Sequence, residues 1–208
     1  MILPDHEILK LIREGKLAVE PLTDPEMQIQ PSGVDLTLGN EFRLFKRTSK
    51  AFIDTKVDAG DYTELVDKKD GEPFILHPGE FVLAKVREYI KLPDDLVGSL
   101  DGRSSLGRLG VVVHTTSSSV NPGWEGNLVL EMTNVGAMPV AIYPGMRVCK
   151  ISFHQMTSAA ARPYGARQGK YQKQTTVTES RMGEDQELRK AEPLGAFVKG
   201  GRKNIQKK

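Results

Sequence analysis

Residues 102–110 of the chain carry side chains that bind anions. The segment reads Gly-Arg-Ser-Ser-Leu-Gly-Arg-Leu-Gly and holds two arginines, two serines and three glycines. Arginine forks bind phosphate oxygens in pairs, serine hydroxyls add donors, and glycines let backbone N–H groups approach an anion. The segment predicts a polyphosphate site. The spacing matches neither a Walker loop nor a dinucleotide fingerprint. The alternative interpretation is therefore kept open: the segment is an ordinary polar turn.

A second segment combines a tight turn with a carboxylate on a strand. The turn, residues 121–126 (Asn-Pro-Gly-Trp-Glu-Gly), contains Trp124, the only tryptophan of the chain. In residues 128–132 (Leu-Val-Leu-Glu-Met) the alternation places Val129 and Glu131 on the face opposite the core. Glu131 is either a solvated carboxylate or a proton-transfer group in a pocket. A core position is one interpretation of Trp124, and it is compatible with a further contact of its ring.

Short β-strands must position these two segments. Short β-type runs recur through the middle of the 208-residue chain, which also contains 20 glycines and 12 prolines. This pattern is typical of an all-β sandwich or barrel. With 38% hydrophobic residues the chain can form one domain with a well-packed core, whereas its length is short for two full-sized domains. We expect a mainly β fold, a jelly-roll-type barrel or sandwich with a short N-terminal helix.

The sequence pattern also predicts where the elements lie. The helix is expected at residues 3–15, where a proline and two acidic residues begin the segment and a glycine ends it. Alternation and turn residues predict strands at 34–38, 42–45, 74–76, 81–86, 96–100, 111–114, 128–132, 140–142 and 147–153. Residues 74–76 and 81–86 flank a His-Pro-Gly turn and are expected to form a hairpin-like unit. The polar residues 46–72 are expected outside the core.

Charge and cysteine content limit the class of protein. The single cysteine, Cys149, cannot form an internal disulfide, and no apolar run is long enough to span a bilayer or to form a signal peptide. We therefore expect a cytoplasmic protein without a membrane partner. The net charge is +2, but residues 189–208 hold seven basic side chains against Glu192 alone. We expect this basic tail to be a solvated, flexible end; contact with nucleic acid is the alternative.

Several motifs together resemble the dCTP deaminase family, which includes bifunctional deaminase/dUTPase members. The resemblance rests on residues 102–110, 121–126, 129–131 and 143–146, with flanking motifs at 30–36, 163–164 and 169–172. It covers about residues 1–174 in the family's order. It implies a dUTPase-like jelly-roll domain and a homotrimer with active sites shared between neighbouring subunits. A flap at residues 158–174 would close each site, and residues 175–208 would form a charged, flexible extension.

The same resemblance implies roles for individual side chains. The arginines and serines of residues 102–110 would contact the phosphates and the base, and Val129 with Glu131 would hold the cytosine edge. Trp124 would lie against the deoxyribose, and the flap would reach the triphosphate, which the family binds with magnesium. The implied substrate-binding residues are Arg103, Ser104, Ser105, Arg108, Ser117, Asn121, Trp124, Val129, Glu131, Tyr164, Lys170 and Gln174. The partners would be dCTP, dUTP or dTTP-type nucleotides.

Deamination sets chemical requirements that the implied residues can meet. Attack of water on C4 of cytosine needs a base for the water proton and an acid for the ring and the departing ammonia, and one carboxyl group can do both. Glu131 is the candidate, with Ser104 and the carbonyl of Ser117 placing the water and Arg108 completing the implied catalytic set. The zinc-dependent route needs a His/Cys/Cys or three-cysteine set. One cysteine and four histidines cannot supply that set, so zinc is not expected.

The chain departs from the family pattern at Asn121, where most members have an aspartate. In the dUTPase relatives this carboxylate activates the water that cleaves the triphosphate, and in the deaminases it helps to hold the sugar. An amide can still form hydrogen bonds, but it cannot act as a base. The residue therefore favours release of dUTP, whereas Gly107 and the small residues 117–119 match bifunctional members that form dUMP. Three interpretations stay open: a deaminase, a bifunctional enzyme or dUTPase, and a nucleotide-binding protein without activity.

Overall fold

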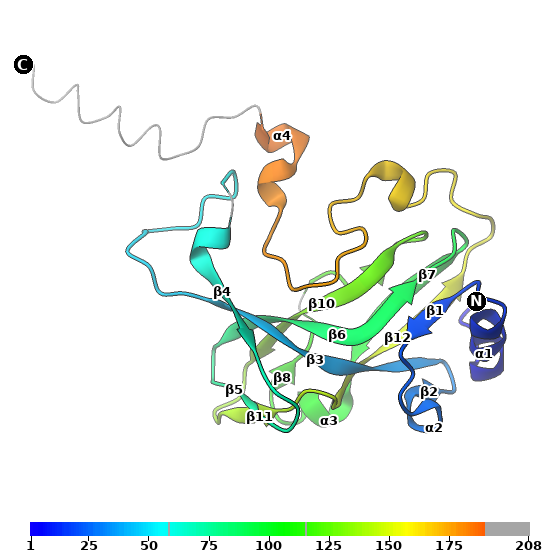
Figure 1. Cartoon of the computed structure of the whole chain (residues 1–208), viewed down its shortest axis with the longest axis horizontal. Coiled ribbons are helices and arrows are strands. Elements are labelled where there is room, and N and C mark those ends of the chain that lie inside the picture. The colour runs from blue at the N-terminus through cyan, green and yellow to red at the C-terminus, as the bar shows by residue number, and fades with distance from the viewer. Residues whose placement is uncertain (58, 115, 190–208) are drawn as a thin grey trace, which may run out of the picture. The chain divides into compact units, whose positions relative to one another are not determined.

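The structure, a computed structural model, describes residues 1–57, 59–114 and 116–189 (Figure 1). The chain forms two compact units. The first comprises Met1–Leu44 and Leu65–Thr178, and the second comprises Phe45–Glu64 and the described residues from Glu179 onward. The basic tail falls almost entirely on residues 190–208, which lie outside the described residues. The flexible extension expected there stays a prediction.

The first unit is built on antiparallel strands, so the expected mainly β fold is confirmed. The main path of its large sheet runs β8 (Val111–Val112), β10 (Glu125–Asn134), β6 (Phe81–Lys91), β3 (Gly33–Phe45), β12 (Arg147–Gln155), β7 (Leu96–Gly102) and β9 (Ser119–Val120). Off this path, β1 (Ala18–Glu20) pairs with β6, and β2 (Ile29–Gln30) pairs with β3. A separate small sheet pairs β5 (Phe74–Leu76) with β11 (Val140–Ile142).

Strand β3 changes its pairing partners along its length. Val34 to Thr37 lie opposite β12, whereas Leu38 and the residues after it lie opposite β6. At the change, the backbone N–H of Thr37 donates to the Glu88 carboxylate at 2.9 and 3.1 Å, and its hydroxyl donates at 2.7 Å. Burial of Glu88 raises its pKa despite these hydrogen bonds. The carboxyl group therefore satisfies a backbone donor at the point where β3 turns from one neighbour to the other.

Two glycines let β3 lie close to its neighbours. A Cβ at Gly33 would collide with the carbonyl oxygen of Ile151, and one at Gly39 would come within 2.8 Å of the carbonyl oxygen of Lys85. Larger residues would push the strands apart. The hydrophobic core lies against the inward side chains of the sheet, which alternate along β6 and β10 as the sequence predicts.

The expected N-terminal helix is confirmed as α1 (Asp5–Arg13). It has Asp5 in its first turn and Arg13 in its last, which suits the helix dipole, and Ile8 is fully buried. Gly15 follows with a φ of 68°, a conformation that favours glycine. Two further helices of the first unit are short: α2 (Pro25–Gln28) and α3 (Ser104–Gly107). Among the described residues, no helix is long and apolar enough to cross a membrane.

Two expectations about strands need correction. Residues 34–38 and 42–45 belong to one long strand, β3, and not to two strands. The hairpin expected from residues 74–76 and 81–86 is wrong, because β5 pairs with β11. Strand β6 has both of its edges occupied, by β3 on one side and by β10 on the other. The preceding strand therefore has no free edge of β6 to join.

The second unit contains short helical turns. Its helical elements are η1 (Gly60–Tyr62), η3 (Met182–Glu184) and α4 (Gln186–Arg189). The Lys50 ammonium group lies 4.5 Å from the centre of the Tyr62 ring and pairs with Asp61 at 3.2 Å. Strand β4 (Thr63–Asp67) begins in this unit and ends in the first.

We expect the thiol of Cys149 to be unreactive while the protein is folded. Cys149 is fully buried in β12, and burial, with a smaller effect of the Glu88 and Asp35 carboxylates, raises the pKa of its thiol. The reactive thiolate is therefore scarce. Titration with a chromogenic disulfide reagent at pH 8 should detect one thiol per chain in urea and almost none before unfolding. Rapid reaction of the native protein would contradict the burial of this residue.

Candidate active site

The glycine- and arginine-rich segment 102–110 is anchored so that its polar side chains face outward. Within it, α3 buries Leu106, while Ser104, Ser105 and Arg108 are exposed. Gly110 has a φ of 84°, and a Cβ there would come within 2.7 Å of Gly136, so the end of the segment is pinned against the loop after β10. Both serines and Arg108 are thus presented to solvent from a fixed backbone.

A buried carboxylate holds two arginines beside this segment. Asp35 on β3 accepts a hydrogen bond from Arg147 at 3.1 Å and lies 3.6 Å from Nε of Arg103. Arg103 also donates to the backbone carbonyl of Arg147 at 3.1 Å. The side chain of Asp35 is 8% exposed. Arg103, expected to contact phosphate, is therefore oriented by a carboxylate from another strand. The sequence pattern indicates no role for Asp35 and gives no signal for Arg147.

Glu131 lies on the outward face of β10, as the alternation predicts. Its carboxylate accepts a hydrogen bond of 2.6 Å from the hydroxyl of Thr116. In the loop that contains Thr116, Nε2 of His114 is hydrogen-bonded to the carbonyl of Ser117. A carbonyl can only accept, so Nε2 is the donor. Among the described residues, no hydrogen-bond partner reaches the buried Nδ1 of His114. The structure therefore brings Glu131 next to the loop that contains Ser117, and adds Thr116 and His114, which the sequence analysis missed.

The C-terminal segment folds back along the turn that leads into β10. The backbone N–H of Tyr164 donates to the carbonyl of Pro122 at 2.8 Å. The indole of Trp124 donates to the carbonyl of Tyr171 at 3.2 Å. Trp124 is 5% exposed and belongs to the hydrophobic core, so its core interpretation is confirmed. Lys170 lies half-buried in the same segment. The residues expected in the flap thus cover the turn that carries Trp124.

Gln174 is held at a β-bulge. The pairing of β10 with β6 shifts between Asn127 and Val129, and the Asn127 side chain donates to the carbonyl of Arg87 at 3.1 Å. The backbone N–H of Asn127 is thereby available for the carbonyl of Gln174, at 2.8 Å. The Gln174 amide donates to the carbonyl of Asn127 at 3.1 Å. The bulge therefore fixes the last residue of the expected flap on β10.

The two groups of predicted site residues lie at opposite ends of β10. Residues 103–108 lead to Val111, which pairs with Asn134 at the C-terminal end of the strand. The turn containing Asn121, which is exposed, and Trp124 leads into its N-terminal end. Ten residues at about 3.3 Å each separate Trp124 from Asn134, a span of roughly 30 Å. The turn and the anion-binding segment therefore do not surround one compact site within a single chain.

The described part of the chain contains no group of three or more His, Cys, Asp or Glu side chains placed to hold a metal ion. The hydroxyl of Thr116 is hydrogen-bonded to Glu131, and the carbonyl of Ser117 and the imidazole of His114 lie in the same loop as Thr116. Hydroxyl, carbonyl and carboxylate groups can orient water and move protons.

Comparisons with known proteins agree with the motifs. The family described as dCTP deaminase-like matches residues 2–156. A relative from Methanobrevibacter smithii, named dCTP deaminase, dUMP-forming, is 51% identical over 91% of this chain and 99% of its own. One from Natronomonas pharaonis, named dCTP deaminase, is 46% identical over 90% and 98%. The crystal structure of 2'-deoxycytidine 5'-triphosphate deaminase from Agrobacterium tumefaciens aligns at TM-score 0.58 and 25% identity, over 74% of this chain but only about half, 48%, of that one.

We expect Asp35→Asn to destabilise the protein by about 1–3 kcal/mol, because two arginines then lose their charged acceptor in a mostly buried site. The matched control is Asp70→Asn, which removes the partner of Arg87. The Asp70 side chain is 76% exposed, so this change should cost about 0–1 kcal/mol. Urea unfolding of both variants measures the difference. Equal stabilities would show that Asp35 does not hold the two arginines.

Proposed function

Because the chain belongs to the dCTP deaminase-like family, we propose that it is a hydrolase that removes the amino group at C4 of dCTP as ammonia and forms dUTP. One observation carries the proposal. Glu131 stands on the outward face of a strand, bonded to Thr116 and beside the loop of Ser117, and is not a freely solvated carboxylate. A carboxylate so placed can take a proton from water and return it to the substrate.

The proposed reaction needs no protein-bound metal. Glu131 takes one proton from the attacking water as its oxygen bonds to C4, and delivers it to the ring nitrogen. The second water proton passes through the same carboxylate to the amino group, which leaves as ammonia, so that water is added and ammonia is lost. Ser104 and the carbonyl of Ser117 place the water, Arg108 completes the catalytic set, and Val129 contacts the edge of the base. Magnesium would arrive bound to the triphosphate and balance its charge.

The proposed active unit is a homotrimer with each site shared between two chains. The separation of the anion-binding segment from the turn at the other end of β10 supports this arrangement. A neighbouring copy would supply Arg103, Ser104, Ser105 and Arg108 to the carboxylate, turn and flap of the first. The flap residues Tyr164, Lys170 and Gln174 would then bind the triphosphate and close the site. Head-to-tail contacts that close into a ring give every copy the same two neighbours, so each site of the trimer would be built alike.

A second candidate is the dUMP-forming reaction, in which the dUTP is also cleaved to dUMP and diphosphate. It is favoured by relatives with that name at 50–51% identity, including those from Methanobrevibacter smithii and Dictyoglomus thermophilum. Against it stands Asn121, whose amide cannot activate a water molecule at neutral pH. In the first candidate the two reactions therefore depend on different positions. Glu131 serves deamination, whereas hydrolysis of the triphosphate would need a carboxylate at position 121, where this chain has Asn121.

We expect Glu131→Gln to lower the rate of deamination by about 10²-fold or more while dCTP still binds, because glutamine keeps the size and loses the proton shuttle. Spectrophotometry at the cytosine absorbance band measures the rate, and calorimetric titration measures binding. Glu20→Gln is the control, since this exposed residue of β1 lies outside the site. Undiminished activity in Glu131→Gln would leave the carboxylate without a catalytic role.

The product distribution separates the two candidates. With dCTP and magnesium, the protein should release dUTP, and diphosphate should form only slowly. Asn121→Asp restores a carboxylate that can act as a base, so diphosphate should then appear from both dCTP and dUTP. Chromatography of the nucleotides and an enzyme-coupled diphosphate assay follow both reactions. Fast diphosphate release from dUTP by the unaltered protein would favour the dUMP-forming candidate.

A further inference from the structure

Three neighbouring strands carry a continuous outward face around Glu131. In the registers of these strands, Leu83 of β6 lies opposite both Glu131 of β10 and Arg43 of β3, and Lys85 lies opposite Val129. Residues directly opposite each other point to the same side of a sheet. Arg43 is therefore two strands from Glu131, about 10 Å away, and Lys85 is the direct neighbour of Val129.

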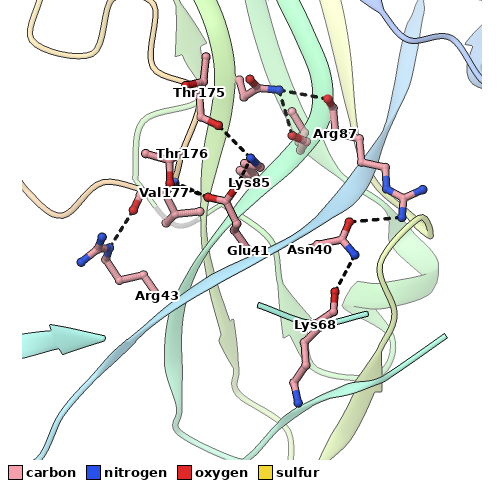
Figure 2. A network of polar contacts seen from close by, with 11 residues as sticks. Asn40, Glu41, Arg43, Lys68, Lys85, Arg87, Thr175, Thr176 and Val177 are labelled. Atoms are coloured by element: carbon pink, nitrogen blue, oxygen red, sulfur yellow. Dashed lines mark hydrogen bonds and ion pairs between the residues drawn. The ribbon is translucent and has the colours of Figure 1, made fainter. Parts of the chain in front are cut away.

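Residues 175–177, here called the strap, cross this face and are bound at every residue (Figure 2). Lys85 donates to the carbonyl of Thr175 at 2.8 Å. The Thr176 hydroxyl donates to Glu41 at 2.6 Å, and the backbone N–H of Val177 donates to the same oxygen at 3.2 Å. Lys85 also pairs with the other oxygen of Glu41. The ion pair therefore contacts three consecutive residues of the strap.

The far end of the strap is fixed by packing. Val177 is fully buried, and Arg43 donates to its carbonyl at 2.8 Å (Figure 2). Immediately before the strap, Gln174 is held at the bulge of β10, and the Thr178 hydroxyl donates to its side-chain oxygen at 3.3 Å. The residue expected to contact the triphosphate is thus held from both sides.

Glu41 stays negatively charged at neutral pH and can therefore hold both Lys85 and the strap. Burial alone would raise the pKa of Glu41, but hydrogen bonds from Lys85, Thr176 and Val177 outweigh it and lower the pKa, so the carboxylate stays ionised at neutral pH. The side chains of Lys85 and Glu41 are only 18% and 22% exposed. Without the strap, Glu41 would lose two donors and Lys85 one acceptor. Hydrogen bonds to charged groups are stronger than those between neutral groups, so the pair favours a docked strap.

We propose that Glu41 and Lys85 are positioning residues that hold the strap on the face of Val129 and Glu131 and thereby fix Gln174 for binding of the nucleotide triphosphate. This inference rests on the proposed function. The pair touches no reacting atom. It acts through the strap, and it makes each chain close its flap over its own β10 and not over that of a neighbour.

The test measures KM and kcat for dCTP in the full-length variants Glu41→Gln, Lys85→Met and Thr176→Val. Each variant removes at least one contact of the clamp, by which we mean the Glu41–Lys85 ion pair together with its hydrogen bonds to the strap. Thr176→Val leaves the ion pair itself intact. KM should rise about tenfold for the two ion-pair variants, the change expected from loss of one charge-assisted hydrogen bond, and less for Thr176→Val. The kcat at saturating dCTP should change by less than about threefold, since Glu131 is untouched. Lys85→Arg keeps the charge and should restore a KM near the original.

Glu72→Gln is the matched control, because it breaks the exposed Lys68–Glu72 pair of the same unit. It should leave KM unchanged. Unchanged KM in Glu41→Gln and Lys85→Met, with thermal unfolding midpoints like that of the unaltered protein, would overturn the positioning role. A rise in KM for Glu72→Gln as large as that for Glu41→Gln would also overturn it, since the loss of any ion pair would then have the same effect.

Limited proteolysis gives a readout that does not depend on deamination. Trypsin should cut after Lys170 or Lys173 faster in Glu41→Gln and Lys85→Met than in the unaltered protein, because the segment before the strap is less firmly held. Failure of the unaltered protein to deaminate dCTP would contradict the proposed function while this comparison still decides whether the clamp exists. Identical cleavage rates in all variants would show that the pair does not hold the strap.

Discussion

The arrangement of the whole first unit depends on the change of partners along β3. One half of this strand pairs with β12 and the other with β6, and the backbone donor left over at Thr37 is satisfied by the buried carboxyl group of Glu88. The same strand carries Asp35 in its first half and Glu41 in its second. A single continuous backbone therefore sets the position of the arginines beside α3 and of the strap beyond the flap.

Electrostatic pairing follows this division. Near α3, one carboxylate orients two arginines whose remaining donors can receive an anion, which suits a phosphate-binding surface. On the outward face of β10, the hydroxyl of Thr116 is hydrogen-bonded to Glu131, a contact that suits a carboxylate that must accept and release protons. The anion-binding segment and the turn that carries Trp124 lie at opposite ends of β10, so the proposed chemistry requires that copies of the chain meet. In the proposed homotrimer, each copy would supply the anion-binding segment to one site and Glu131 to another.

Local patterns in the sequence predict the elements well and their pairing less well. The alternation around Leu130 and Glu131 predicts which side chains of β10 face outward, and proline, acids and glycine predict helix α1. The hairpin of β5 and β6 was wrong because short-range turn signals cannot show that both edges of β6 are taken. Thr116, Arg147 and the Glu41–Lys85 pair escaped notice because each acts through a partner distant in sequence. Such pairings follow from topology and have no local pattern.

The central claim, that two copies complete each site, is tested most directly by mixing two inactive variants. Glu131→Gln lacks the carboxylate and Arg108→Ala lacks the residue supplied by the neighbour. After the two are unfolded together and refolded as mixed trimers, some interfaces should combine an intact Glu131 with an intact Arg108. Recovery of up to about one quarter of the original deaminase activity is expected, the fraction of intact interfaces in a random equal mixture of heterologous contacts. Mixed assemblies that are verified by mass spectrometry and stay as inactive as the separate variants would contradict it.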